Sequence, residues 1–346
     1  MSRQFHEDYL FKSIIEDNIS KEKLFNIDID NEFLQFYNYK NALLNKYENF
    51  TFEDFKGSKV INNDYGEVLQ ITTEEPINFN LKDNDYRNNL KSNLKLVPGI
   101  GVKKEISLKS NGYNSLEDLS NHDRYCDKAS AVLDNIDNLT SPNLIDFIKS
   151  NRYGKDCNLN LLKSASLFDK GDFKFMDIET LGLSNVPIIL IGVAEIVNNK
   201  IRSTQYLVRD VVEEAAALNC FISHLDEDSA HVTFNGKFFD IPYIRNRLRN
   251  FRISDFKLDI PHFDLLYYAR YLWGDKLLNC QLQTIEKDIF GIERCGDVPG
   301  QYIPGYYDTY LKEGNLGPLI PIVDHNRQDI VSLASFLMKM YGEVNG

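Results

Sequence analysis

The C-terminal half of the sequence changes repeatedly between strand-like and helix-like patterns of hydrophobic positions. Three strands are predicted in succession from Phe173, and helices then alternate with one short strand. The predicted strands are residues 173–180, 186–196, 200–210 and 230–234. The predicted helices are residues 211–225, 241–250, 263–273, 281–290 and 319–341. This order indicates an α/β domain whose central sheet is covered by helices.

The patterns upstream are weaker and divide the chain into shorter regions. A helix is predicted at residues 31–47, a strand at 66–72 and a helix at 144–150, the last within a polar stretch typical of a connector. The predicted division is residues 1–85, an N-terminal α+β region of unknown role; 86–140, a small helical region; 141–169, a connector; and 170–346, the α/β domain.

Composition narrows the class of protein. The longest apolar run, residues 186–191, has the length of a buried strand, so no membrane segment is expected. The N-terminus lacks the pattern of a secretory signal, which makes a cytoplasmic location the default expectation. Five scattered cysteines without a CxxC pair predict reduced thiols. The net charge of −12 argues against strong overall attraction to nucleic acid, although a local basic patch can coexist with it.

Two acids stand on one predicted strand. Asp177 and Glu179 are two residues apart, so their side chains project from the same face. An Asp-x-Glu pair alone is more often explained by a solvated edge strand than by a functional site. Here an apolar run precedes the pair and a turn follows it at once, which favours a functional site at the end of a buried strand.

Two further acids lie at or near the start of predicted helices. Asp240 follows Asn235, Gly236 and two phenylalanines, and an N-cap role would explain Asp240 but not the residues before it. Asp329 shares a helical face with His325, four residues earlier, ahead of an apolar stripe that would dock the helix on the sheet. Phosphoryl transfer with two metal ions needs three or four converging carboxylates, and this domain supplies that set.

Three segments carry a resemblance to a known family. They are FMDIETLGL, FNGKFFDIPYIRNRL and HNRQDIVSLASFL, supported by PHFDLLYYARYLW, CQLQTIE and DVPG. They resemble the exonuclease motifs of the DEDD (DnaQ-like) group in the ribonuclease-H-like superfamily, and in particular the YprB-like predicted exonucleases. The resemblance covers roughly residues 170–345. It implies a five-stranded mixed sheet flanked by helices.

The resemblance also implies an activity and its residues. The implied activity is 3′–5′ exonucleolytic hydrolysis of DNA or RNA at a single-stranded 3′ end, with two Mg²⁺ or Mn²⁺ ions. The implied metal ligands are Asp177, Glu179, Asp240 and Asp329. His325 is the candidate general base. Nucleic-acid contacts are expected at Asn235 and Lys237.

One feature departs from the histidine-type exonucleases of this superfamily. Their histidine usually precedes the last aspartate by five residues, whereas His325 precedes Asp329 by four, the position of tyrosine in the tyrosine-type branch. The helical phase differs by about 100° between the two spacings. The sequence therefore leaves open whether His325 reaches the attacking water.

A glycine hairpin upstream resembles a helix-hairpin-helix. Its turn contains Gly99 and Gly101, followed by Lys103 and Lys104. Such a turn presents backbone N–H groups at a helix N-terminus, where a phosphate oxygen can bind without regard to base sequence. The alternative is a plain helical hairpin with a glycine turn.

Further alternatives stay open at this stage. The tyrosine-rich segment of residues 296–318 is predicted as a loop whose rings either stack on unpaired bases or pack against each other. For the whole chain, the alternatives to an exonuclease are a structure-selective endonuclease on the same fold and a catalytically silent nucleic-acid-binding protein.

Overall fold

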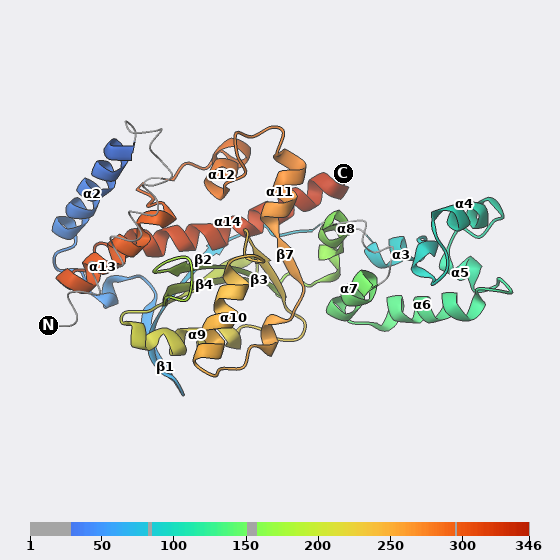
Figure 1. The fold of residues 1–346 in the computed structure, drawn as a ribbon, viewed down its shortest axis with the longest axis horizontal. Helices are drawn as coiled ribbons and strands as arrows, with labels where there is room; N and C mark the ends of the chain where they lie inside the picture. Colours follow the sequence, from blue (N-terminus) through green and yellow to red (C-terminus); the bar gives the residue numbers. More distant parts are fainter. Residues whose placement is uncertain (1–28, 82–84, 151–157, 295, 346) are drawn as a thin grey trace. The chain divides into compact units, whose positions relative to one another are not determined.

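The computed structural model describes residues 29–81, 85–150, 158–294 and 296–345 (Figure 1). The chain divides into two compact units. One comprises Met1–Phe50 with Gly305–Ile320, and the other comprises Thr51–Pro304 with Pro321–Gly346. None of the described helices combines the length and apolar composition that crossing a membrane requires.

The first unit is built on α2 (Ile29–Lys46) and α13 (Ile303–Glu313). The Tyr306 hydroxyl donates a hydrogen bond to the Phe36 carbonyl at 2.8 Å. The prediction of a loop at residues 296–318 is therefore wrong at its centre, where α13 forms. Tyr306, Tyr307 and Tyr310 are buried, so packing, not stacking on bases, accounts for them.

A seven-stranded mixed sheet forms the centre of the second unit. Its strands are β1 (Ser58–Asn63), β2 (Gly66–Pro76), β3 (Phe173–Thr180), β4 (Ile188–Val197), β5 (Lys200–Leu207), β6 (Ala230–Thr233) and β7 (His262–Asp264). Their order is β1-β2-β5-β4-β3-β6-β7; β6 and β7 run parallel to β3, and the other pairs are antiparallel.

The expected count of five strands is corrected to seven. Strands β3 to β7 are the five of the predicted α/β domain, and the hairpin β1–β2 extends their sheet by pairing β2 with β5. The sequence showed β2 but not this pairing, because an antiparallel partner more than a hundred residues away leaves no local signal.

Helices cover both faces of this sheet. They are α8 (Asn158–Lys163), α9 (Glu214–Ser223), α10 (Asp240–Asn250), α11 (Leu265–Trp273), α12 (Leu282–Phe290) and α14 (Leu319–Asn345). Single-turn helices are η1 (Phe52–Asp54), η3 (Ser164–Leu167), η4 (Val211–Glu213), η5 (Phe256–Leu258) and η6 (Gly300–Tyr302). In Figure 1, α14 runs along one side of the sheet, and α9 and α10 lie on the other.

Alternation along β3 decides which side chains meet which helices. Phe173 and Phe175 pack in one buried cluster with residues of α11, α12 and α14. Met176 and Ile178 point the other way, into a cluster with α9 and α10. Because side chains alternate along a strand, Asp177 and Glu179 belong to the α14 face.

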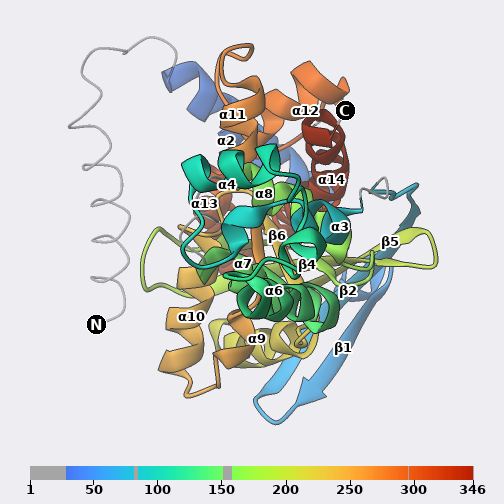
Figure 2. The ribbon, with the colours of Figure 1, turned by 90° about the vertical axis from the view of Figure 1, so that its right-hand side faces the viewer.

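The helical region of the second unit, whose helices lie together in Figure 2, has a hydrophobic core of its own. Its elements are α3 (Tyr86–Lys91), η2 (Leu94–Leu96), α4 (Val102–Ser110), α5 (Leu116–Leu119), α6 (Cys126–Asn138) and α7 (Ser141–Ser150). Leu94, Ile100, Leu116 and Ile136 are fully buried there. The predicted helical character of residues 86–140 and the helix near 144–150 are confirmed.

A buried histidine of β6 and a half-buried histidine of β7 lie side by side on these parallel strands. His231 and His262 are paired in register, with ring centroids 5.5 Å apart. Burial lowers the pKa of His231 to about 4 and that of His262 to about 2. Both rings are therefore neutral at neutral pH.

Replacing His231 with phenylalanine is expected to make the protein more resistant to acid. The unfolded chain holds the proton more tightly than the folded one, so His231 destabilises the wild type as pH falls from about 6.5 to about 4. The full shift corresponds to about 3 kcal/mol. Urea unfolding of both proteins across this range measures it. An identical acid-induced loss of stability in the two proteins would contradict this origin.

Candidate active site

The first two acids lie at the end of the central strand β3. Asp177 is half-buried and Glu179 is 8% exposed, on the face that α14 covers. Asp177 is paired across the sheet with Gly192 of β4, which in turn is paired with Gln205 of β5. This row of three positions underlies the site.

Asn326 of α14 fastens Asp177 to that row. Its Nδ2 donates to Oδ2 of Asp177 at 2.9 Å and to the Asp177 carbonyl at 3.2 Å. Its Oδ1 accepts from Nε2 of Gln205 at 3.0 Å. A Cβ added to Gly192 would lie 2.1 Å from this Oδ1. This role of Asn326 was not predicted from the sequence, where its signal is a glycine inside an apolar strand, which often marks a close approach.

Asp240 is the first residue of α10 and reaches back to β3. Its Oδ1 accepts a hydrogen bond from the Ile178 N–H at 3.2 Å. Phe239, not Asp240, is the N-cap. The turn that leads there begins at Asn235, whose φ is +70°, and passes Gly236, where a Cβ would lie 2.6 Å from Thr233. The preceding residues thus shape the turn that delivers Asp240.

The buried Asp264 holds this turn from β7. Its carboxylate accepts hydrogen bonds from the N–H groups of Asn235 at 2.9 Å and Lys237 at 3.1 Å. It also accepts from the Leu266 N–H at the start of α11. The side chains of Asn235 and Lys237, predicted to contact nucleic acid, are exposed.

His325 lies among the acids despite its four-residue spacing. Its Nε2 is 3.6 Å from Oδ2 of Asp329 and 3.9 Å from Oε1 of Glu179. Its Nδ1 donates to Oδ1 of Asp297 at 2.5 Å. A carboxylate on Nδ1 fixes the tautomer of a neutral ring and turns Nε2 toward the acids. The structure therefore brings together the five predicted residues: Asp177, Glu179, Asp240, His325 and Asp329.

Arg294, whose side chain is 10% exposed, completes the cluster. An NH group of Arg294 lies 2.6 Å from Oδ1 of Asp329, and its Nε donates to Glu286 at 2.5 Å. Glu286 is fully buried and also accepts from Ser332. The sequence segments that contain Glu286 and Asp297 contributed to the family resemblance, but their pairing with Arg294 and His325 depends on tertiary contacts.

The four acids repel one another in this arrangement. Burial and the charges of Glu179, Asp329 and Asp240 raise the pKa of Asp177 well above its usual range. Burial and neighbouring carboxylates do the same for the pKa of Glu179. Burial raises the pKa of Asp240 to about 7, and it raises that of Asp329 despite the opposing charges of His325 and Arg294.

The side chains fit a divalent cation by chemistry but not by their present arrangement. Carboxylate oxygens are the ligands that Mg²⁺ and Mn²⁺ prefer, and a cation would relieve the repulsion. Within the described ranges, however, no three His, Cys, Asp or Glu side chains form a group that could hold a metal ion as they stand. Asp329 is instead paired with Arg294, and Asp240 with a backbone N–H.

The glycine hairpin upstream has the geometry of a tight turn. Gly99 has a φ of +96°, and Gly101 is the N-cap of α4 without a side-chain hydrogen bond. Lys104 donates through Nζ to the Gly99 carbonyl at 2.8 Å, which closes the turn, and Lys103 is exposed. Glu105 offsets part of the local positive charge by pairing with two other lysines.

The sequence of the α/β domain matches the model of a known superfamily. Residues 174–341 match the family model of the RNase H superfamily, so the C-terminal half of the chain carries a domain of that superfamily. The chain is also 35% identical over 181 residues to the uncharacterized protein YprB of Bacillus subtilis (strain 168). That alignment covers 51% of this chain and 44% of the relative, so the shared region is less than half of YprB. The resemblance inferred from the motifs is confirmed.

Replacing Asp297 with asparagine is expected to lower the pKa of His325. Burial alone would lower that pKa, but the hydrogen bond from Asp297 and the charges of Asp329 and Asp297 outweigh burial and raise it. Titration of the histidine Cε1–H signals by NMR, in metal-free protein, measures the change. Asp275→Asn, at an exposed position, is the matched control. An unchanged His325 titration in Asp297→Asn would rule out this coupling.

Proposed function

We propose that this protein is a metal-dependent 3′–5′ exonuclease that hydrolyses phosphodiester bonds of DNA or RNA. The observation that carries the proposal is the convergence of Asp177, Glu179, Asp240 and Asp329 beside His325 at one end of the sheet. An RNase H superfamily domain is consistent with nuclease chemistry.

Asp177, Glu179, Asp240 and Asp329 are the residues that would hold Mg²⁺ or Mn²⁺. When bound, two such ions supply activation of water and stabilisation of the leaving oxygen. Binding requires Asp329 to turn from Arg294 or to share its carboxylate with it. The mutual repulsion of the acids favours that exchange, because a divalent cation neutralises more charge than one guanidinium.

His325 would accept the proton of the attacking water at Nε2. Asp297 holds Nδ1 and thereby keeps Nε2 directed at Glu179 and Asp329. A general base must be neutral before it acts, and positive charge beside Glu179 and Asp329 would lower the pKa of His325 toward that state.

The nucleic-acid strand would be bound through its phosphate backbone, by contacts that do not depend on base sequence. Gly99 and Gly101 offer the N–H groups at the start of α4, and Lys103 adds positive charge. Asn235 and Lys237 are exposed on the turn before Asp240 and are proposed to contact the strand near the acids.

One observation favours a catalytically silent binding protein instead. The ion pair between Arg294 and Asp329 already neutralises one acid without a metal ion. A silent protein would bind labelled DNA or RNA and leave it intact with both Mg²⁺ and Mn²⁺.

The decisive experiment follows the cleavage of end-labelled linear DNA and RNA with Mn²⁺. Stepwise loss of nucleotides from the 3′ end supports the proposal. Cutting of circular single-stranded DNA, which has no end, would replace it with an endonuclease. Binding without cleavage of any substrate would leave the silent protein.

A further inference from the structure

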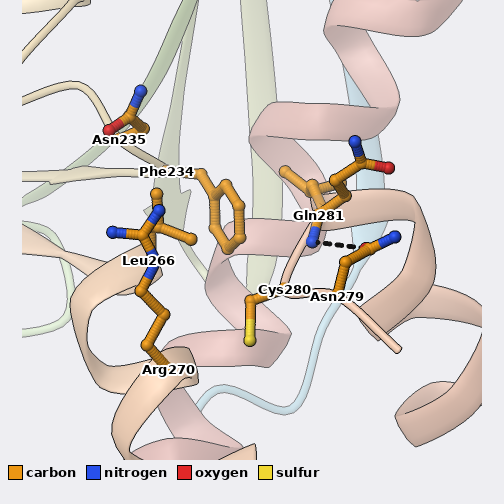
Figure 3. Close-up of a pocket in the computed structure, with 8 residues that line it drawn as sticks. Phe234, Asn235, Leu266, Arg270, Asn279, Cys280 and Gln281 are labelled. Atoms are coloured by element: carbon orange, nitrogen blue, oxygen red, sulfur yellow. Dashed lines mark hydrogen bonds between the residues drawn. The ribbon is translucent and has the colours of Figure 1, made fainter. Parts of the chain in front are cut away.

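A partly open cavity of about 430 Å³ lies on the α14 face of the sheet (Figure 3). Figure 3 shows Asn235 and Arg270 on one side and Asn279 and Gln281 on the other, with Phe234 between them. Its volume is within the range of small-ligand sites. Of its lining residues, Asn235 alone is already proposed to contact the strand, and neither the four acids nor His325 belongs to the lining.

The sheet register places the cavity beside the carboxylates. Val232 of β6 is paired with Phe175 of β3 in a parallel ladder. Phe234 and Asp177 each follow two residues later, so both belong to the same end and the same face of the sheet. Asn235, also in the lining, begins the turn that leads to Asp240.

Apolar and polar groups are separated within the lining. Phe234 packs edge-on against Phe336 of α14, with ring centroids 6.3 Å apart, which fixes an aromatic floor. Leu266 and Leu282 extend the apolar surface. An unpaired base, which has a flat apolar face, fits such a surface.

The polar groups are mainly hydrogen-bond donors. Arg270 of α11 is exposed and supplies the positive charge of the lining. Asn279 accepts from the Gln281 N–H and from the Thr284 hydroxyl through Oδ1, which leaves its NH₂ group to donate. Gln281, the N-cap of α12, makes no side-chain hydrogen bond to the first helical turn. This lining fits a nucleotide. The positive charge suits its phosphate, and the apolar floor and the amide donors suit its base.

We propose that this cavity binds one unpaired nucleotide of the substrate strand, near the phosphodiester that the carboxylates would attack. The phosphate pairs with Arg270, the base lies over Phe234 and Leu266, and the base edge meets Asn279 and Gln281. This inference rests on the proposed nuclease function and adds a subsite that selects single-stranded substrate, because a paired base cannot enter.

Arg270→Ala in the full chain tests the subsite. The dissociation constant of a short fluorescein-labelled oligothymidylate, measured by anisotropy in EDTA, is expected to rise about fivefold to tenfold. An abasic residue moved along the strand is expected to weaken wild-type binding most at one position, and Arg270→Ala is expected to reduce that dependence. Arg202→Ala removes a half-buried arginine on β5 that is paired with Glu74 outside the lining, and serves as the control.

Cys280 provides a second measurement that does not depend on the arginine variant. Its thiol is partly exposed in the lining. The oligonucleotide is expected to slow alkylation of Cys280, read by peptide mass spectrometry, and to leave Cys126 unaffected. Unchanged affinity in Arg270→Ala together with unprotected Cys280, in a protein that still binds and cleaves the strand, would overturn the subsite alone. A wild type that neither binds nor cleaves would overturn the nuclease proposal itself.

Discussion

Replacing Asp177 with asparagine is expected to reduce the Mn²⁺-dependent cleavage of end-labelled DNA or RNA by roughly 10³-fold or more. Asp177 stands at the centre of the cluster, and its pKa responds to all three other acids and to His325. Asparagine keeps the hydrogen bond to Asn326, because its side-chain oxygen can accept from Nδ2 as the carboxylate does. The loss would therefore report the missing charge and not a collapsed site.

Asp64→Asn is the matched control for this variant. Asp64 is exposed in the turn between β1 and β2, and three strands separate β1 from β3 in the sheet. The Asp64→Asn protein is expected to cleave the substrate at the wild-type rate. Equal activity in Asp177→Asn and Asp64→Asn would refute the assignment of the site.

Asp177→Asn is also expected to be more stable than the wild type when no metal ion is bound. The pKa of Asp177 is raised in the folded protein, so its contribution to stability is full below the unfolded value of about 4 and is lost as pH rises. At neutral pH the wild type carries that cost and Asp177→Asn does not. Thermal unfolding in EDTA measures the difference, and added Mn²⁺ is expected to stabilise only the wild type appreciably.

Replacing Gly192 with alanine is expected to destabilise the protein by about 3 kcal/mol. The new Cβ would lie 2.1 Å from Oδ1 of Asn326, a residue that is fully buried and hydrogen-bonded to Gln205 and Asp177. Asn326 cannot withdraw without breaking these bonds. The expected result is a lower urea midpoint and a weaker nuclease.

A second glycine and a double variant give this prediction its controls. Gly171→Ala places a Cβ in ordinary contact, 3.7 Å from the Ile196 carbonyl, and is expected to be nearly neutral. Asn326→Ala removes the clashing group, so Gly192→Ala is expected to cost much less in its presence. Additive losses in the double variant would show that the glycine acts elsewhere.

The strands and helices of the C-terminal half follow from local pattern. The four strands predicted there correspond to β3, β4, β5 and β6, and the long helices to α9, α10, α11, α12 and α14. β7 was missed because three residues are too few to show a period. α13 was missed because glycine and proline at its start favoured a loop.

Some residues of the candidate site are likewise predicted by the sequence, whereas the position of others depends on the fold. Alternation on β3 fixes Asp177 and Glu179 on one face, and the family motifs identify Asp240, His325 and Asp329. The sequence left the reach of His325 open. In the fold its Nε2 lies within 4 Å of two acids, because Asp297 holds the opposite ring nitrogen.

The sequence by itself determined most elements of the C-terminal half, the order of its acids and the resemblance to the ribonuclease-H-like superfamily. These depend on the period of hydrophobic positions and on motifs read within a few residues. Only the tertiary structure decided that β1 and β2 extend the sheet, that Gly192 makes room for Asn326, and that Arg294 neutralises Asp329. Each of these joins residues distant along the chain, and such pairings are set by packing and charge in the folded state, which no local pattern records.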